Sequence, residues 1–252
     1  MSHPDQIPCR KEFANFLQQE ISVARVARGC PMRTVGILGG MGPEATVLLM
    51  SRVIAAVQAR DDADHIPLIV HQNPGVPSRI RHLIDRTGPD PAPVLAGMAR
   101  DLQAAGAEAL AMPCNTAHAY AGAVRDATTL PFLDMVQATV ARLEPGTRVG
   151  MLASPAVRLA GVFDAALAAR RIVPVWPDDD ALALALIRRV KAGDAGGSAC
   201  AELARQADCL TGVDHLLVAC TEMSILAQGL GGRSYTDSLD CLVADIVTFA
   251  RS

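Results

Sequence analysis

An internal repeat is the feature of this sequence that most restricts its fold. The motif Val-Gly-Ile-Leu at residues 35–38 recurs as Val-Gly-Met-Leu at residues 149–152. Each copy is followed, much later, by an apolar run that ends in cysteine: Ala-Met-Pro-Cys-Asn at 111–115 and Leu-Val-Ala-Cys-Thr at 217–221. Two matched landmarks in the same order predict two similar lobes related by a pseudo-twofold axis. The two cysteines would then face each other across the cleft.

Between these landmarks, short apolar runs alternate with longer Ala- and Arg-rich segments. Such runs, bounded by Gly, Pro or Asn, are typical of buried parallel strands. The segments between them are typical of helices that cover both faces of a sheet. The expected strands are 35–38, 68–71, 109–112, 132–134, 149–152, 172–175 and 216–219. The expected helices are 44–60, 92–105, 116–126, 135–143, 156–169, 179–192, 198–210 and 222–229. The sequence therefore predicts an α/β fold with two pseudo-symmetric lobes, parallel sheets and a site in the cleft between them.

The repeat also suggests where the domain boundaries lie. We expect a first lobe formed by residues 34–133 together with 235–252, and a second lobe formed by residues 134–234. Residues 1–33 precede the repeat as an N-terminal extension, in which 11–27 have the pattern of one amphipathic helix. Its acidic residues argue against an organelle-targeting peptide.

Charge and composition exclude several classes of partner. The net charge is −3, aromatic residues make up 3% of the chain and no basic run occurs, so nucleic acid is not expected as a partner. No apolar stretch approaches the length of a membrane span, so no membrane is expected either. The seven cysteines form no CxxC pair, and no signal peptide is seen. This pattern is typical of reduced thiols in a cytoplasmic protein.

Cys114 and Cys220 are the leading candidates for chemistry. Each is expected where a buried strand ends and a helix begins, which is the edge at which ligands bind in open α/β sheets. The positive end of a helix dipole lowers the pKa of a thiol below its free value of about 8.5. One buried cysteine is an ordinary core residue, but two at matched positions of a repeat favour a shared function.

Polar groups beside the two cysteines can form a seat for a carboxylate. Asn115 and Thr116 follow the first cysteine and Thr221 follows the second, and free backbone N–H groups at a helix start also bind anions. The two threonines equally fit helix N-caps, and a cap can also touch a ligand. His118 lies one helical turn after Cys114. A supporting hydrogen bond suits it better than a metal site, because no second ligand pair stands nearby.

Two further segments are expected at the same edge of the first sheet. Residues 39–45, Gly-Gly-Met-Gly-Pro-Glu-Ala, fit a turn whose backbone approaches a small anionic ligand, with Met41 at its centre. The turn satisfies the loose dinucleotide fingerprint, but the acidic residue that should close the second strand is missing. In the loop at 71–82, Arg79 or Arg81 can clamp a carboxylate with two hydrogen bonds.

Lys191 is one of only two lysines in a chain that otherwise uses arginine. This choice hints that a compact point charge is wanted at the position. Because neither a metal-ligand set nor a complete nucleotide fingerprint is found, we expect an enzyme that needs no metal and no cofactor.

Three of these segments closely resemble the aspartate/glutamate racemase family, which works without pyridoxal phosphate. The matching stretches are 36–46, 112–118 and 219–222, and the similarity covers roughly residues 34–252. The resemblance implies two flavodoxin-like lobes, an amino acid as the small-molecule substrate, and a homodimer. It also implies that Cys114 and Cys220 interconvert L- and D-enantiomers by proton transfer at Cα. The substrate contacts that we expect are Met41, Arg79, Asn115, Thr116, Lys191 and Thr221.

The resemblance leaves the amino acid open. In aspartate racemases of this family, an Arg in a Pro-Asp-Arg-Thr loop and a Lys in the second lobe bind the substrate carboxylates. Arg79 and Lys191 stand in these places, whereas Ser78 and Ile80 depart from the loop motif. Cysteine at both catalytic positions favours a symmetric, two-way racemase. The alternatives are another thiol acid/base enzyme of the same fold, such as a hydantoin racemase or maleate isomerase, and an inactive protein that binds a small anion.

Overall fold

Two four-stranded parallel sheets form the framework of the protein. The computed structural model describes residues 32–252, and the predicted helix at 11–27 lies outside these residues. The strand order is β2-β1-β3-β4 in the first sheet and β6-β5-β7-β8 in the second. The strands of the first sheet are β1 (Val35–Gly39), β2 (Leu68–Gln72), β3 (Ala109–Ala111) and β4 (Phe132–Leu133). Those of the second sheet are β5 (Arg148–Ala153), β6 (Val173–Val175), β7 (His215–Ala219) and β8 (Tyr235–Asp237).

The two sheets have the same topology, as the repeat predicted. The first two strands of each lobe pair side by side, and the third strand lies on the other side of the first. All pairs are parallel. The predicted α/β fold with two pseudo-symmetric lobes is therefore confirmed.

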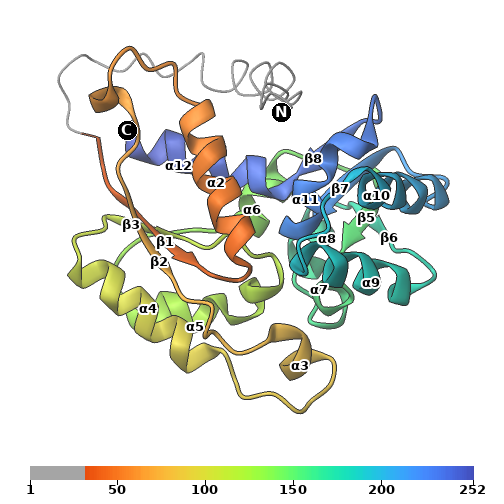
Figure 1. Ribbon diagram of the computed structural model, residues 1–252, viewed down its shortest axis with the longest axis horizontal. Helices are drawn as coiled ribbons and strands as arrows, with labels where there is room; N and C mark the ends of the chain where they lie inside the picture. Colours follow the sequence, from red (N-terminus) through yellow and green to blue (C-terminus); the bar gives the residue numbers. More distant parts are fainter. Residues whose placement is uncertain (1–31) are drawn as a thin grey trace, which may run out of the picture.

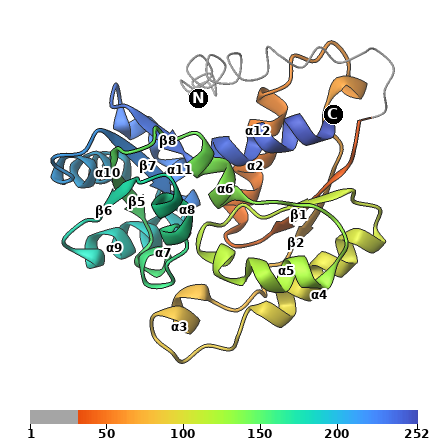
Figure 2. The same ribbon diagram turned by 180° about the vertical axis from the view of Figure 1, so that it is seen from behind.

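Helices cover both faces of the first sheet. On one face lie α2 and α12, whose apolar side chains pack with Val35 and Ile37 of β1. On the other face lie α4 and α5, packed with Leu38 and Leu110. Figure 1 shows the two helix layers above and below this sheet, and Figure 2 shows them from behind. The helices of this lobe are α2 (Pro43–Ala55), α3 (Arg79–Leu83), α4 (Ala92–Ala104), α5 (Ala121–Ala127), α12 (Ser238–Ala250), and the 3-10 helices η1 (Asp62–Asp64) and η2 (Thr116–Tyr120).

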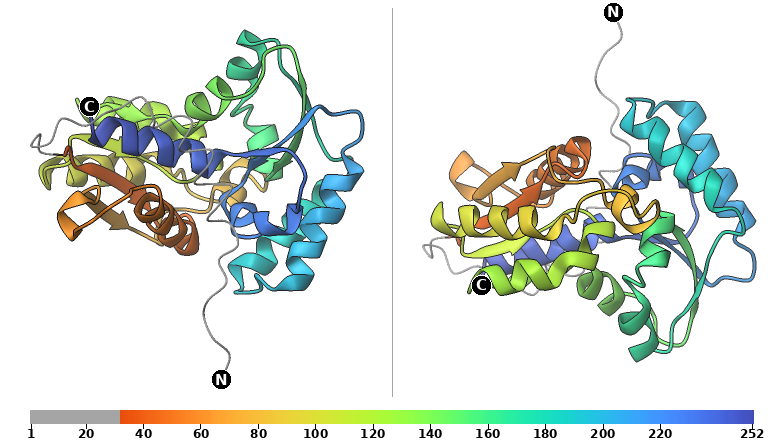
Figure 3. Two further views of the ribbon diagram at one scale, coloured as in Figure 1. Left: turned by 90° about the horizontal axis from the view of Figure 1, so that it is seen from above. Right: turned by 90° about the horizontal axis from the view of Figure 1, so that it is seen from below.

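The second sheet is covered in the same way. One face packs against α6, α7 and α8, and the other against α9, α10 and α11. The views from above and below in Figure 3 separate the two lobes, with α12 crossing from the second toward the far end of the first. The helices are α6 (Met135–Ala141), α7 (Pro155–Leu159), α8 (Asp164–Ala169), α9 (Asp180–Lys191), α10 (Gly197–Cys209), α11 (Thr221–Ile225) and the 3-10 helix η3 (Ala227–Leu230).

The repeated glycine of the Val-Gly-[Ile/Met]-Leu motif has the same packing role in both lobes. A Cβ on Gly36 would lie 2.9 Å from the Cβ of Ala107 and 3.1 Å from Leu110. A Cβ on Gly150 would lie 2.9 Å from Leu216. Leu110 and Leu216 are the partners of these glycines on β3 and β7. The sequence repeat thus records a shared packing constraint, because any side chain there would push the neighbouring strand's leucine away.

Each predicted strand is present, but the sequence analysis missed two elements near the C-terminus. β8 has only three residues and no apolar run, so it carries no strand pattern. It pairs with β7 in the second sheet, which corrects the assignment of residues 235–237 to the first lobe. The helix α12 that follows does pack on the first lobe. The predicted helix at 156–169 is divided into α7 and α8, with Gly161 at φ +60° between them.

Removal of residues 1–31 should leave a folded and active protein. Among the described residues, Met32 packs against the hydrophobic cluster between β1, α2 and α12. The backbone N–H of Arg33 donates to the Ala250 carbonyl. We expect the truncated chain to match the full chain in thermal unfolding and in turnover. A large decrease in the unfolding temperature of the truncated chain would show that the extension covers part of the core.

Candidate active site

One pocket brings together residues from both lobes. It contains both candidate cysteines and four of the six predicted substrate contacts, namely Met41, Arg79, Thr116 and Lys191. Its wall is formed by Met41, Ser78, Arg79, Ile80, Cys114, Thr116, Ser154, Ile187, Lys191, Cys220 and Glu222. Residues predicted from separate motifs thus meet at one place in the fold.

The two cysteines reach this pocket from equivalent positions. Cys114 follows β3, and Cys220 follows β7, the strand at the corresponding place in the second sheet. Because β3 is parallel to β1 and β7 is parallel to β5, each cysteine follows its strand at the same edge of the sheet as the carboxyl end of the first strand. Both side chains are buried, at 6% and 5% exposure. The pseudo-symmetry of the fold therefore delivers one thiol to the pocket from each lobe.

The Arg79 guanidinium is held in place by backbone carbonyl groups. It donates to the carbonyl oxygens of Pro77 at 3.1 Å, Met41 at 3.3 Å and Val76 at 3.4 Å. These acceptors belong to the β2–α3 loop and to the turn after β1. At that turn Gly40 has φ +93°, and a Cβ there would lie 2.4 Å from the backbone of Asn73. Glycine is thus required for the turn to approach this loop and to support the arginine.

Glu222 is a pocket residue that the sequence analysis did not select. Its Oε2 accepts a hydrogen bond from the Cys220 thiol at 3.2 Å, and its Oε1 lies 3.3 Å from the Lys191 Nζ. The carboxylate therefore links the second cysteine to the pocket's lysine. The available signal was its place two residues after the cysteine, where the first turn of α11 turns the side chain back toward the thiol.

The pKa of Cys220 is raised well above that of a free thiol, contrary to the expectation from a helix dipole. Burial is the largest cause, and the negative charge of Glu222 and its hydrogen bond add to it, while Lys191 acts in the opposite direction. Cys220 does stand at the N-cap of α11, but this helix has only five residues. Desolvation and the adjacent carboxylate outweigh it, so Cys220 carries its proton in the resting protein.

His118 supports the first cysteine through the backbone. Its Nδ1 lies 2.9 Å from the Cys114 carbonyl oxygen, and its Nε2 lies 3.1 Å from the Met135 backbone nitrogen. Because the Met135 N–H must donate, Nε2 is the acceptor and Nδ1 carries the proton. Burial lowers the pKa of His118, which favours this neutral form. The predicted supporting hydrogen bond is confirmed, and it goes to the carbonyl group rather than to the thiol.

Asn115 and Thr221 are buried but are not part of the pocket wall. The Asn115 Nδ2 donates to the Ser238 Oγ at 2.8 Å, and its Oδ1 has no hydrogen-bond partner among residues 32–252. Neither Thr116 nor Thr221 is a helix N-cap. Those positions are held by Asn115 and Cys220, and each threonine is the first residue of its helix.

Replacing Glu222 with Gln should lower the pKa of Cys220, because the change removes a negative charge beside the thiol and keeps the size of the side chain. Replacing Lys191 with Met should raise it, because the nearby positive charge is lost. The pH dependence of Cys220 alkylation, followed by peptide mass spectrometry, measures both shifts. A pKa that moves the same way in the two variants would contradict this electrostatic account.

Two further classes of site were sought in the described part of the chain. Among residues 32–252, no group of three His, Cys, Asp or Glu residues is placed to hold a metal ion. None of the helices there is both long enough and apolar enough to cross a membrane.

Sequence comparison finds similarity to a racemase family and to a racemase of that kind. The sequence model of the Asp/Glu/hydantoin racemase family matches residues 38–246. The broad specificity amino-acid racemase RacX of Bacillus subtilis (strain 168) is 32% identical over 110 residues, which are 42% of this chain and 47% of that protein. The matched region thus spans about half of that relative.

Solved structures of similar fold extend over most of the chain. The Picrophilus torridus aspartate racemase superposes with a TM-score of 0.75 at 26% identity, covering 86% of this chain and 94% of that one. An aspartate racemase homologue from Pyrococcus horikoshii OT3 has a TM-score of 0.64 at 18% identity, covering 88% of this chain and 100% of that one.

Proposed function

Because this chain belongs to the Asp/Glu/hydantoin racemase family, we propose that it is a cofactor-independent amino-acid racemase in which Cys114 and Cys220 transfer protons at Cα. One observation carries the proposal. Two cysteines from equivalent positions of the two lobes line the same pocket, as a reaction that works on both faces of one carbon requires.

Inversion at Cα needs two acid/base groups. One group removes the α-proton from one face, and the other delivers a proton to the opposite face while the substrate stays bound. One cysteine must therefore be a thiolate when the other is a thiol, and the roles exchange with the handedness of the substrate.

The protonation state of Cys220 in the resting protein suggests which cysteine donates a proton first. Burial and Glu222 keep Cys220 protonated, so Cys220 is the proton donor in this state and Cys114 is the base. For the opposite enantiomer Cys220 must become the thiolate. Movement of Lys191 closer to the thiol, or transfer of a proton to Glu222, would favour that form, since both change the charge next to the sulfur.

The α-carboxylate is assigned to Arg79. The guanidinium is already oriented by three backbone carbonyl groups, so little entropy is lost when it binds a planar anion. A cation at this carboxylate also stabilises the negative charge that develops when the α-proton leaves. Thr116, which also lines the pocket, supplies a further donor through its hydroxyl group.

Lys191 is assigned to a second carboxylate, which is present only in an acidic amino acid. Its ammonium group is already paired with Glu222, so an acidic side chain must share the lysine with this residue. A neutral side chain would instead face Met41, Ile80 and Ile187 on the same wall. The choice of substrate thus depends on the balance between these contacts.

A panel of L- and D-amino acids in deuterated water tests the proposal. We expect racemisation of at least one amino acid, with incorporation of deuterium at Cα, and full activity in the presence of a chelator. Chiral chromatography and mass spectrometry measure the two events. Turnover of hydantoins or maleate alone would assign the protein to the other enzymes of the family, and binding without any exchange would make it an anion-binding protein. Homodimer assembly and a cytoplasmic location also stay predictions.

A further inference from the structure

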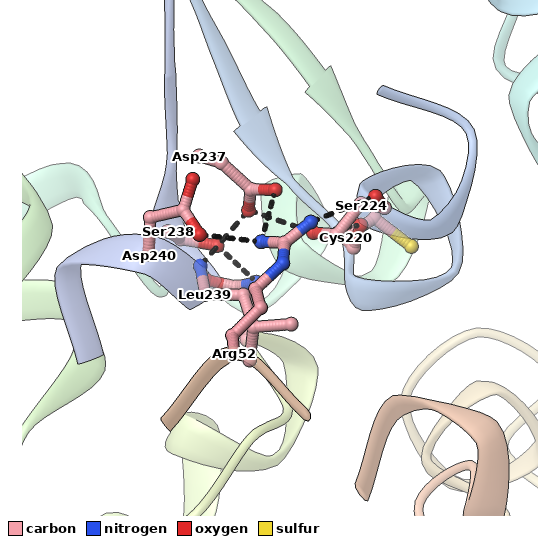
Figure 4. Close-up of polar contacts among 8 residues, drawn as sticks. Arg52, Cys220, Ser224, Asp237, Ser238, Leu239 and Asp240 are labelled. Atoms are coloured by element: carbon pink, nitrogen blue, oxygen red, sulfur yellow. Dashed lines mark hydrogen bonds and ion pairs between the residues drawn. The ribbon is translucent and has the colours of Figure 1, made fainter. Parts of the chain in front are cut away.

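A partly buried polar network, none of whose charged residues lines the pocket, joins the two lobes. Its centre is Arg52 on α2 of the first lobe (Figure 4). The Arg52 Nη1 lies 2.7 Å from the Asp237 Oδ2 and 2.8 Å from the Asp240 Oδ1, and its Nη2 donates to the Ser224 carbonyl at 3.0 Å. The side chains of Arg52 and Asp237 are only 12% and 1% exposed.

The network contacts the segment that follows Cys220. Ser224 belongs to α11, which begins directly after the cysteine, and its backbone N–H donates to the Cys220 carbonyl at 3.0 Å. The Ser224 hydroxyl donates to the Asp237 Oδ1 at 2.7 Å. Asp237 in turn ends β8 and caps α12 by accepting from the Leu239 N–H at 2.9 Å. Arg52 and Asp237 thus hold α11 from two directions.

The neighbouring residue contacts the segment that follows Cys114. The Ser238 Oγ accepts the hydrogen bond from Asn115, the residue directly after that cysteine. Asp237 and Ser238 form the junction at which the chain passes from the second sheet to α12 on the first lobe. One dipeptide therefore bonds to the segment that follows each cysteine, through the Ser224 hydroxyl after Cys220 and the Asn115 amide after Cys114.

We propose that Arg52, Asp237 and Ser238 are positioning residues that set the separation of Cys114 and Cys220. The proposal rests on the proposed function. It adds to that function the contacts that hold the two acid/base groups at the required distance from each other. A two-base reaction needs both sulfur atoms within reach of one carbon, and a misplacement of about 1 Å can cost about a hundredfold in rate. None of the three residues lines the pocket, so they act through the two backbone segments.

Two conservative variants test this role from the two sides. Arg52→Lys keeps the positive charge but loses the forked contact with Ser224 and the aspartates. Ser238→Ala removes only the acceptor of Asn115. In both we expect kcat for racemisation to fall about tenfold to a hundredfold, with KM near that of the unchanged protein.

Exchange of the α-hydrogen supplies a readout that a loss of stability does not change. If the sulfur atoms are misaligned, one cysteine still removes a proton and returns deuterium to the same face, while delivery to the other face fails. We therefore expect the ratio of deuterium exchange to racemisation to rise in both variants.

Arg142→Lys is the matched control. Arg142 also forms a partly buried ion pair with an aspartate of α12, Asp245, at 3.0 Å, and it donates to the Ala138 carbonyl on α6 at 2.9 Å. We expect this variant to keep its kcat and its exchange-to-racemisation ratio. If Arg52→Lys and Ser238→Ala behave like Arg142→Lys once the folded fraction is measured by circular dichroism, the network only stabilises the fold and the proposal is wrong.

A cross-linking measurement separates this proposal from the proposed function, because it needs no substrate. In a background with Cys9, Cys30, Cys200 and Cys209 replaced by serine, a short bifunctional thiol reagent should bridge Cys114 and Cys220. The bridging should be slower when Arg52→Lys is added to the same background. Equal bridging rates would overturn the positioning role even if no amino acid is racemised. Slower bridging with no racemisation by the unchanged protein would support the positioning role and contradict the proposed function.

Discussion

Replacement of either Cys114 or Cys220 with alanine should abolish racemisation, with a loss of about a hundredfold to ten-thousandfold, the range typical of a positioned acid or base. Each variant keeps one acid/base group on one face of Cα. It should therefore still exchange the α-hydrogen of one enantiomer with deuterated water, and the two variants should prefer opposite enantiomers. Chiral chromatography and mass spectrometry of the same samples measure both rates.

Cys209 offers a matched control for these variants. It is an exposed free cysteine outside the pocket, so Cys209→Ala should racemise at the rate of the unchanged protein. If Cys114→Ala or Cys220→Ala does the same, that cysteine is not a catalytic base. If both variants exchange the same enantiomer, the two thiols do not act on opposite faces.

Replacement of Arg79 with alanine should have the second largest effect. Loss of a charge-assisted partner costs about 2–5 kcal/mol, which corresponds to roughly a thirtyfold to several-thousandfold decrease in kcat/KM. We expect Arg79→Lys to recover only part of this loss, because an ammonium group cannot reproduce the two parallel hydrogen bonds of a guanidinium group. Steady-state kinetics with the preferred amino acid gives the comparison.

The control for this experiment is Arg81→Ala on the same short helix. Arg81 is exposed and does not line the pocket, so its replacement changes net charge by the same amount without removing the proposed contact. Equal effects of Arg79→Ala and Arg81→Ala would show that only the overall charge matters. Wild-type kinetics of Arg79→Ala would show that the carboxylate is held elsewhere.

The sequence alone was enough to predict the two lobes, the order of the predicted strands along the chain, and the two cysteines that the fold brings to one pocket. These features depend on local sequence patterns, which can be recognised in one sequence without its structure. Buried parallel strands are continuous apolar runs, and the glycines at 36 and 150 recur because both lobes need the same close packing. The family motifs also led to Arg79 and Lys191, and the fold brings both to the pocket.

Only the tertiary structure decided how these groups are tuned and connected. Arg52 and Asp237 are 185 residues apart in sequence, and no local pattern records their contact. The sequence pointed to a lowered thiol pKa, whereas burial and Glu222 raise that of Cys220. The physical reason is that periodicity and turn chemistry are short-range properties of the chain. Desolvation and ion pairing depend instead on which distant side chains the folded lobes enclose together.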